Sequence, residues 1–249
     1  MSAKGGKKLS VIIPAYNEGH RIGKTLLEVN GYLSRQNFDY EIIVVVDGAK
    51  DNTASVVSQM LGQVKNLRLI DNQQNHGKGW VVRQGMLKAT GSFRLFMDAD
   101  NSTSIEQIEK FWPFAETGQY DIVIGSIEVA GAQIHEQAQW YRRFLGHWSK
   151  YLIRFVAGLW HIHDTQRGFK LFSARAATEI FSRARVDRFG FDIEILAMGK
   201  RLGFKIKEVP VVWNNAGEST VNLKSYVEVL RDLFRIRWYL WTGKYGKSM

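Results

Sequence analysis

Apolar runs and helical repeats alternate along the first half of the chain. Short apolar runs bounded by polar residues predict buried strands at residues 9–15, 40–48, 66–72, 93–100 and 120–126. Apolar residues at helical spacing between these runs predict helices at residues 18–36, 51–61 and 77–90. The first helix would bury a face formed by Ile22, Leu26, Val29 and Leu33. Asn52 or Thr53 would cap the second helix.

Strands that alternate with helices predict an α/β fold. Each connection is then a right-handed crossover, which gives a mainly parallel sheet covered by helices on both faces. The sequence contains no internal repeat and no low-complexity linker. We therefore expect one main domain over residues 1–222, followed by a C-terminal amphipathic helix and tail over residues 223–249.

Two long amphipathic helices are predicted in the second half, over residues 140–160 and 223–241. Apolar side chains recur at helical spacing in the first, at Trp140, Phe144, Trp148, Leu152, Phe155 and Leu159. The second has an apolar stripe of Leu223, Tyr226, Leu230, Leu233 and Phe234, with basic residues elsewhere on its surface. Such helices either pack on the sheet or lie in a membrane interface. We expect these helices to be partly packed on the sheet and partly in contact with a membrane, with membrane contact by at least one of them.

Composition narrows the classes of protein. The 249 residues contain no cysteine, which excludes disulfides and thiolate metal sites. The basic N-terminus is not followed by an apolar signal segment, and no uninterrupted apolar run reaches the roughly 20 residues that span a bilayer. The net charge of +10 favours an anionic partner, which is a nucleic acid, a phosphorylated ligand or an acidic membrane.

Polar residues follow three of the predicted strands. Pro14, Tyr16 and Glu18 lie in the sequence PAYNE at the first strand end, Asp47 ends the second, and Asp98 and Asp100 end the fourth. Ligands bind beyond the carboxyl ends of the strands in open parallel sheets. Carboxylates can instead cap the next helix or form turns. Three such strand ends together favour a nucleotide diphosphate held through Mg²⁺ or Mn²⁺.

The motifs VIIPAYNE, EIIVVVDGAKDNT and FMDAD resemble those of the family 2 glycosyltransferases with the GT-A fold. Three later motifs, DTQRGFKLFSARAA, FGFDIEIL and EVPVVWNNAGEST, are similar to the branch that makes dolichyl-phosphate glucose or mannose, and closer to its glucose-type enzymes. The resemblance covers nearly the whole chain. It implies inverting transfer of a hexose from UDP-glucose or GDP-mannose to a polyprenyl (dolichyl-type) phosphate, which gives a β-linked product.

The resemblance also implies roles for individual residues. The pocket for the base and ribose would be lined by Pro14, Ala15, Tyr16, Glu18, Val45 and Asp47. Asp98 and Ala99 would lie near the ribose and diphosphate, and Asp100 would bind the metal. Asn101 could add an amide oxygen to the metal or cap the next helix. Lys78, at the start of the third helix, would either approach phosphate or remain an ordinary exposed lysine.

The chain departs from the family pattern at Val46, which replaces one of two acids, and at Ile127, where arginine is common. Another cation must therefore hold the acceptor phosphate. The basic residues considered for this are Arg142, Arg143, Arg167 and Lys170, each of which can equally be a solvated or salt-bridged surface residue. A phosphate acceptor is already ionised at neutral pH and needs no general base. Asp192 is therefore predicted to organise these arginines. The predicted catalytic set is Asp98, Asp100, Asp192, Arg142, Arg143 and Arg167.

Other interpretations are a family 2 transferase with a non-lipid, protein or glycan acceptor, and a non-catalytic binder of nucleotide sugars. A nucleic-acid-binding module is disfavoured because acids at three strand ends repel phosphate in the absence of metal. The lipid acceptor predicts a peripheral protein on the cytoplasmic face of a membrane. The chain would attach by itself or through a membrane partner subunit.

Overall fold

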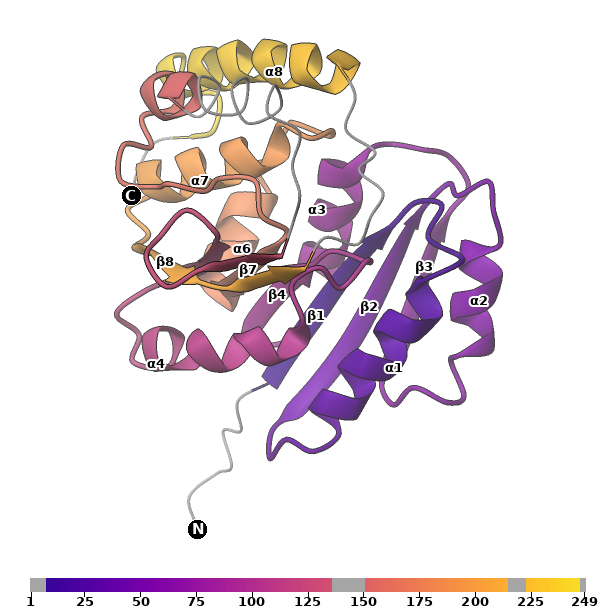
Figure 1. Ribbon diagram of the computed structural model, residues 1–249. Helices are drawn as coiled ribbons and strands as arrows, with labels where there is room; N and C mark the ends of the chain where they lie inside the picture. Colours follow the sequence, from indigo (N-terminus) through magenta and orange to yellow (C-terminus); the bar gives the residue numbers. More distant parts are fainter. Residues whose placement is uncertain (1–7, 136–150, 215–222, 247–249) are drawn as a thin grey trace.

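The computed structural model describes residues 8–135, 151–214 and 223–246. Its main sheet has seven strands in the order β3-β2-β1-β4-β7-β5-β8 (Figure 1). These strands are β1 (Lys8–Ala15), β2 (Asp39–Asp47), β3 (Leu67–Asn72), β4 (Phe93–Met97), β5 (Ile122–Ser126), β7 (Phe169–Ser173) and β8 (Ile206–Pro210). A second, two-stranded sheet pairs β6 (Gln133–His135) with β9 (Val212–Asn214).

Helices cover both faces of the main sheet. They are α1 (Ile22–Leu33), α2 (Thr53–Gln59), α3 (Lys78–Lys88), α4 (Trp112–Ala115), α6 (Ala174–Phe181), α7 (Phe191–Arg201) and α8 (Leu223–Trp241), with a 3₁₀ helix, η1 (Ile105–Lys110). Residues 151–157, the first described residues after a gap, are also helical. β7 runs antiparallel to β4 and β5, whereas the other pairs in the sheet are parallel. The predicted α/β fold with a mainly parallel sheet is confirmed.

Strand register brings the predicted strand ends together. Ala15 of β1 lies opposite Val46 of β2, and Ile12 lies opposite Phe96 of β4. The chain therefore leaves β1, β2 and β4 at one edge of the sheet, where the carboxyl ends of parallel strands meet. This edge is the upper side of the sheet in Figure 1, away from the N-terminus.

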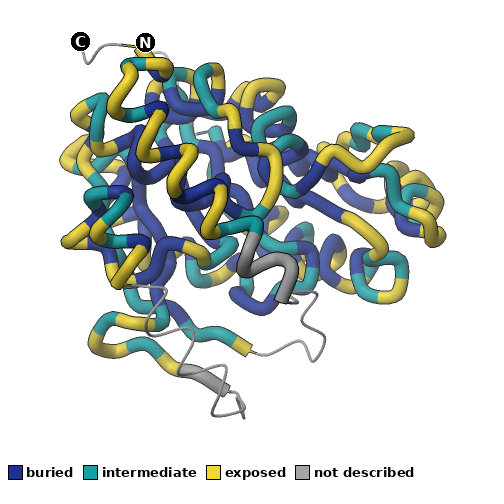
Figure 2. Tube along the Cα trace, turned by 90° about the horizontal axis from the view of Figure 1, so that it is seen from above, coloured by how far each residue is buried: buried dark blue, intermediate teal, exposed yellow. Residues whose placement is uncertain are grey.

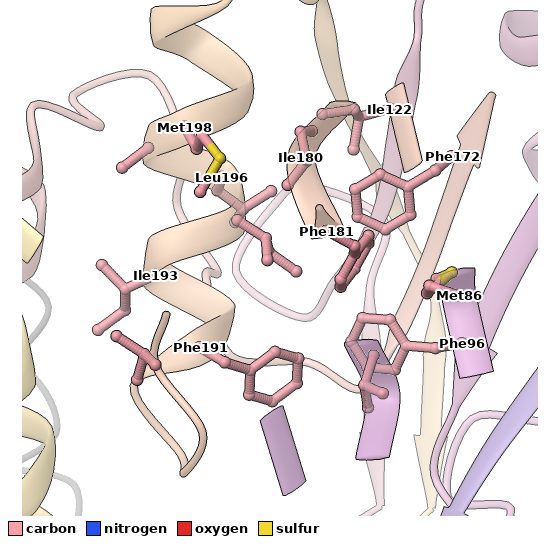
Figure 3. Packing of buried hydrophobic residues seen from close by; sticks show 14 of the residues in the cluster. Met86, Phe96, Ile122, Phe172, Ile180, Phe181, Phe191, Ile193, Leu196 and Met198 are labelled. Carbon is pink, nitrogen blue, oxygen red and sulfur yellow. The ribbon is translucent and has the colours of Figure 1, made fainter. Parts of the chain in front are cut away.

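The core forms two clusters because successive strand residues face opposite sides of the sheet. Val11, Val44 and Leu95 pack beneath α1, α2 and α4, whereas Ile12 and Phe96 face α3, α6 and α7. Figure 3 shows the second cluster, in which the rings of Phe96 and Phe191 lie 5.7 Å apart. In Figure 2 the buried strands run through the middle of the molecule, with exposed residues on the outer surfaces of the helices.

The predicted face of α1 is confirmed, since Ile22, Leu26, Val29 and Leu33 are all fully buried. The predicted cap residue of α2 is confirmed by position, since Asn52 is the N-cap residue of this helix. The Asn52 side chain makes no capping hydrogen bond. The preceding Asp51 carboxylate instead accepts a hydrogen bond from the Thr53 backbone N–H at 3.0 Å, and the Thr53 hydroxyl donates to it as well.

The first amphipathic helix differs from its prediction. Residues 140–150 lie outside the described residues, and the helix at residues 151–157 stops before Gly158, whose φ is +70°. Within it Ile153 is buried, whereas Phe155 from the predicted stripe is 66% exposed. Leu159 is buried but lies beyond the end of the helix. The apolar stripe therefore does not form one buried face.

Helix α8 also divides its apolar residues between two environments. Leu233 and Ile236 are fully buried in the cluster that includes α7, whereas Leu230 and Phe234 are 38% and 60% exposed. The side chains of Leu223 and Tyr226 lie outside the described residues. The division of the chain at residue 222 stays a prediction, but α8 contributes to the same core as the residues before it.

The C-terminal segment is attached through a buried carboxylate on α7. Glu194 is fully buried and accepts hydrogen bonds from the backbone N–H groups of Arg185 and Val186, at 2.9 and 3.0 Å. The Tyr245 hydroxyl donates to the same carboxylate at 2.7 Å. Burial raises the pKa of Glu194, while these three donors oppose that rise. Glu194 therefore connects the loop before α7 to the segment after α8.

A second buried carboxylate, Glu41 on β2, is hydrogen-bonded at the opposite end of the strands. It accepts from the Ser10 hydroxyl at 2.7 Å, from the Thr90 backbone N–H at 2.7 Å and from Arg68 at 2.9 Å. Burial by itself raises the pKa of Glu41, but these donors outweigh it and lower the pKa from 4.5 to about 2. The ionised form of Glu41 therefore stabilises the fold.

Because the pKa of Glu41 is lower in the folded state, its stabilisation is complete above pH 4.5 and is lost as the pH falls towards 2. We expect Glu41→Gln to lower the free energy of unfolding at pH 7 by roughly 3 kcal/mol and to flatten its dependence on acid pH. Urea denaturation at pH 7, 4.5 and 3 tests this. Asp39→Asn, an exposed carboxylate on the same strand, is the matched control. Equal acid sensitivity of wild type and Glu41→Gln would contradict the assignment.

Candidate active site

The end of β1 and the loop after it are held by hydrogen bonds at the edge of the sheet where the strand ends meet. Pro14 and Ala15 are buried, while Tyr16 is 40% exposed. The Glu18 backbone N–H donates to the Thr53 hydroxyl at 2.8 Å, and its carboxylate pairs with Arg21. Of the predicted residues in this loop, Tyr16 therefore offers the most exposed surface to a ligand.

Asp47 is buried and shapes the loop that precedes α3. Its carboxylate accepts from the backbone N–H groups of His76 and Gly77, at 2.7 and 2.9 Å, and from the Asn75 side chain at 3.0 Å. Val45 is fully buried in the core, so its side chain offers no surface to a nucleotide. The structure thus gives Asp47 the role of positioning the start of α3.

Asp98 and Lys78 form the central ion pair of the site. The Lys78 Nζ lies 2.6 Å from Asp98 Oδ1, with 26% of the lysine side chain and 34% of the aspartate side chain exposed. Burial lowers the pKa of Lys78, but the carboxylates of Asp98, Asp192 and Asp100 outweigh it and raise the pKa. Lys78 is therefore a charged group that faces three acids, not an ordinary surface lysine.

Gly168 allows Asp98 to occupy its position. The Asp98 backbone N–H donates to the Gly168 carbonyl at 3.1 Å. A Cβ atom at Gly168 would lie 2.1 Å from Asp98 Oδ2, which is far inside van der Waals contact. The backbone before β7 therefore packs directly against the Asp98 carboxylate, and only glycine permits that approach.

The residues after Asp98 turn sharply away from β4. The Ala99 carbonyl accepts from the Thr25 hydroxyl at 2.7 Å, and Asp100 Oδ1 accepts from the Ser102 backbone N–H at 2.9 Å. Asn101 has a φ of +53°, and its side-chain amide donates to Glu28. Its Oδ1 is buried and has no hydrogen-bond partner, which leaves it available as a ligand.

These residues fit a metal that is only partly held by the protein. The described residues contain no cluster of three or more histidine, aspartate or glutamate side chains that could hold a metal ion. Asp98 and Asp100 supply two carboxylates, and Asn101 supplies one unpaired oxygen. Mg²⁺ and Mn²⁺ sites commonly have few protein carboxylates and take further ligands from phosphate groups. The donor set therefore fits a metal bound together with a diphosphate.

A buried ion pair lies beside this centre. Lys170 on β7 is fully buried, and its Nζ lies 2.5 Å from Asp192 Oδ1 in the first turn of α7. Burial raises the pKa of Asp192, while Lys170 and Lys78 oppose that rise. Among the described residues the side-chain partner of Asp192 is Lys170 and not Arg167. That Asp192 organises Arg142 and Arg143, which lie outside the described residues, stays a prediction. Lys170 itself is inaccessible to an acceptor.

Arg167 is committed to other partners. Its Nε donates to Asp164 Oδ2 at 3.1 Å, and its guanidinium lies 4.5 Å from the centre of the Trp213 ring. The same Asp164 oxygen accepts from the Ile127 backbone N–H at 3.2 Å. Arg142 and Arg143 lie outside the described residues. The described part of the predicted acceptor set thus serves structural contacts.

A loop that the sequence pattern did not predict, at residues 185–190, packs against the start of α3. The Asp187 carbonyl accepts from the Trp80 backbone N–H at 3.0 Å, and its carboxylate pairs with Arg83 at 2.7 Å. A Cβ atom at Gly79 would lie 2.5 Å from the Val186 carbonyl oxygen. The glycines on either side of Lys78 were the available signal, since they indicate that another segment packs closely there.

Comparison with known proteins agrees with this geometry. Residues 10–181 match the model of the glycosyl transferase family 2, so the chain belongs to that family. It is 37% identical over 247 residues to the dolichyl-phosphate beta-glucosyltransferase ALG5C of Trichomonas vaginalis, covering 94% of this chain and 73% of that protein. It is 34% identical over 255 residues to the human dolichyl-phosphate beta-glucosyltransferase, covering 95% and 77% respectively.

The solved structures give the same fold. Glucosyl-3-phosphoglycerate synthase from Mycobacterium tuberculosis, in complex with Mn²⁺, UDP and glucosyl-3-phosphoglycerate, superposes with a TM-score of 0.70 at 19% identity. The match covers 94% of this chain and 80% of that chain. At this identity the likeness shows the fold alone, and it supports the GT-A-like α/β architecture.

Replacing Gly168 tests whether Asp98 contacts the ligand. We expect Gly168→Ala to displace the Asp98 carboxylate and to weaken the binding of a nucleoside diphosphate by at least about tenfold, because a charge-assisted contact is lost. Calorimetric titration with UDP and GDP in the presence of Mn²⁺ measures this. Gly62→Ala is the control, since a Cβ atom at Gly62 meets nothing within 4 Å. Unchanged affinity in a folded Gly168→Ala variant would remove Asp98 from the site.

Proposed function

We propose that this protein transfers glucose from UDP-glucose to a polyprenyl phosphate of the dolichyl type, with inversion to a β-linked product. The observation that carries this proposal is the identity of 32–37% to dolichyl-phosphate beta-glucosyltransferases over more than nine-tenths of the chain. The sequence alone left glucose and mannose open. The relatives favour glucose, and GDP-mannose is therefore the weaker candidate donor.

Asp98, Asp100 and Lys78 are the residues that we propose to hold the donor diphosphate. The structures of the synthase neighbour contain UDP with Mn²⁺ or Mg²⁺, which supports a uridine nucleotide and a divalent ion for this fold. A bound ion of this kind would stabilise the charge that develops on the leaving diphosphate. Lys78 pairs with Asp98 at 2.6 Å, so its ammonium is already positioned beside the proposed metal ligands.

The chemistry of a phosphate acceptor suits the state of Asp192. An alcohol acceptor needs a base that is accessible to its hydroxyl group, whereas a phosphate monoester is mostly ionised at pH 7. Asp192 is only 4% exposed and is held by Lys170. We infer that Asp192 positions β7 and Gly168 beside the donor and does not accept a proton.

Exposed apolar residues support contact with a membrane. No helix in the described ranges is long and apolar enough to cross a bilayer. On α8, however, Phe234, Trp238 and Trp241 are 60%, 48% and 83% exposed. On the segment that begins at residue 151, Phe155 and Trp160 are also exposed, and their rings lie 5.6 Å apart. Exposed aromatic rings beside basic residues are typical of helices that lie in a membrane interface.

Both segments lie at the top of the view in Figure 1, the side towards which β1 and β2 run. We propose that this surface contacts the membrane that contains the lipid acceptor, which would bring the acceptor to the edge of the sheet. Attachment to the cytoplasmic face stays a prediction. Neither the relatives nor the structure supports the membrane partner subunit that the sequence left open.

The proposed metal role predicts the effect of Asp100→Ala. We expect transfer of labelled glucose from UDP-glucose into the organic phase to fall by at least about a hundredfold, since stabilisation of the leaving diphosphate is lost. Excess chelator should abolish activity of the wild type, and Mn²⁺ should restore it. Asp71→Ala removes an exposed carboxylate at the end of β3 and should leave the rate unchanged.

Near-normal turnover of Asp100→Ala would contradict the metal assignment. The same assay separates the acceptors and donors, with dolichyl phosphate compared with phosphoglyceric acid and UDP-glucose with GDP-mannose. Transfer to the soluble acceptor alone would overturn the proposed function and favour the non-lipid alternative.

Membrane contact can be measured independently of activity. We expect Phe234→Ser combined with Trp238→Ser to reduce association with sedimented liposomes by about tenfold or more, because burial of each apolar side chain contributes about 1.5–3 kcal/mol. Leu27→Ser, an equally exposed apolar residue on α1, is the control. Unchanged association would show that α8 does not form the contact.

A further inference from the structure

A pocket rich in arginine, separate from the donor site, lies between α8 and two loops at the edge of the active site. Its volume is about 180 Å³. It is lined by His76, Asp187, Arg188, Arg231, Asp232 and Arg235. No residue of this pocket belongs to the set predicted from the sequence, and none contributes to the donor site described above.

The positive charge of this pocket is only partly compensated. Asp187 is already paired with Arg83 at 2.7 Å. Asp232 is 4% exposed and packs against Gly190, where a Cβ atom would lie 2.6 Å from the Asp232 Cβ. The exposed guanidinium groups of Arg188 and Arg231 form no ion pair with any described carboxylate. Burial raises the pKa of Asp232, while Arg231 and Arg235 oppose that rise, so Asp232 balances part of their charge. With three arginines beside this one carboxylate, the pocket keeps a net positive charge that favours an anion.

Arg235 has a fixed orientation beside them. Its Nε donates to the Tyr239 hydroxyl at 2.7 Å, which leaves its two terminal nitrogens without a hydrogen-bond partner among the described residues. Planar guanidinium groups with free N–H donors match the oxygens of a phosphate group. Three arginines around a pocket of this size favour a compact dianion over an extended polyanion.

The pocket lies next to the active site, although the two have no lining residue in common. His76 immediately precedes Gly77 and Lys78, and Asp47 accepts hydrogen bonds from the backbone of both His76 and Gly77. The Asp187 carbonyl is hydrogen-bonded to Trp80 in the first turn of α3. A group bound in the pocket therefore lies beside the start of the helix that carries Lys78.

The pocket also borders the exposed apolar stripe of α8. At 3.6 residues per turn, each residue is rotated by about 100° from the one before it. On this geometry Leu230, Phe234, Trp238 and Trp241 form one stripe, with Arg231 and Arg235 along one flank. Arg237 lies along the opposite flank and does not line the pocket. Arg237 can therefore serve as a control for Arg231 and Arg235, since the arginines on both flanks border the proposed membrane contact.

We propose that this pocket binds the phosphate group of the polyprenyl phosphate acceptor through Arg188, Arg231 and Arg235. The proposal rests on the proposed function, and it supplies the cations that Ile127, Arg167 and Lys170 do not provide. The prenyl chain would follow the apolar stripe of α8 into the bilayer. Headgroups of bulk anionic lipid offer the same phosphate chemistry, but they would engage both flanks of α8 equally.

The test uses a water-soluble, short-chain prenyl phosphate without membrane or detergent. We expect Arg231→Gln and Arg188→Gln to weaken its binding to the full chain by about tenfold each, as for loss of a hydrogen bond to a charged group. Arg237→Gln, an equal loss of charge on the same helix, should change the affinity by less than about twofold. Binding is measured by ³¹P NMR titration, and circular dichroism checks that each variant is folded.

Two results would overturn the proposal. One is that the three variants bind the prenyl phosphate equally, which includes the case in which not even the wild type binds it saturably. The other is a pattern in which Arg231→Gln and Arg237→Gln weaken binding to phosphatidylserine vesicles equally and leave the prenyl phosphate affinity unchanged. That pattern would assign the arginines to bulk membrane charge.

The experiments distinguish failure of the proposed function from failure of the proposed phosphate site. If the wild type binds the prenyl phosphate through Arg188 and Arg231 but transfers no glucose to it, the phosphate site is supported and the proposed function is contradicted. If the wild type transfers glucose and both variants keep the normal KM for the lipid, the proposed function is supported and the phosphate site is contradicted. The KM for UDP-glucose should be unchanged in both variants.

Discussion

The ion pair between Lys170 and Asp192 is the constraint on which the active site depends. A buried charge is tolerated only with a partner, and removal of one partner typically costs about 3–5 kcal/mol. Lys170 is on the strand inserted between β4 and β5, and Asp192 is at the start of α7. Their contact fixes β7, and with it the Gly168 backbone that packs on Asp98. The geometry of the donor site therefore depends on the Lys170–Asp192 ion pair, although this pair does not itself need to contact a ligand.

Local pattern was sufficient to predict the parallel half of the sheet. The apolar runs of β1, β2 and β4 and the face of α1 follow directly from periodicity, because each element buries residues at its own repeat. β7 was not predicted, since a lysine in an apolar run indicates a strand that is at least partly exposed. Its burial depends on Asp192, which is 22 residues away in sequence. Such long-range pairing leaves no trace in the local pattern.

The candidate site was predicted in part for the same reason. The acids at the strand ends identified the edge of the sheet where Asp98, Asp100 and Lys78 meet. The sequence could not show that the Asp47 carboxylate accepts hydrogen bonds from the loop before α3, or that Asp164 is hydrogen-bonded to Arg167. Residue type indicates what a side chain is able to bind, whereas tertiary packing decides which partner it has. The cations of the pocket beside α8 were missed because Arg188 is on a loop and Arg231 and Arg235 are on α8, more than 40 positions further along the chain.

The hydrogen bond from Tyr245 to Glu194 makes the start of α3 dependent on the far end of the fold. Glu194 holds the backbone of Arg185 and Val186, and the next residue, Asp187, contacts α3. A chain that stops before residue 245 leaves the Glu194 carboxylate buried with one donor missing. Loss of Tyr245 would therefore be transmitted through Glu194 and Asp187 to the first turn of the helix that carries Lys78.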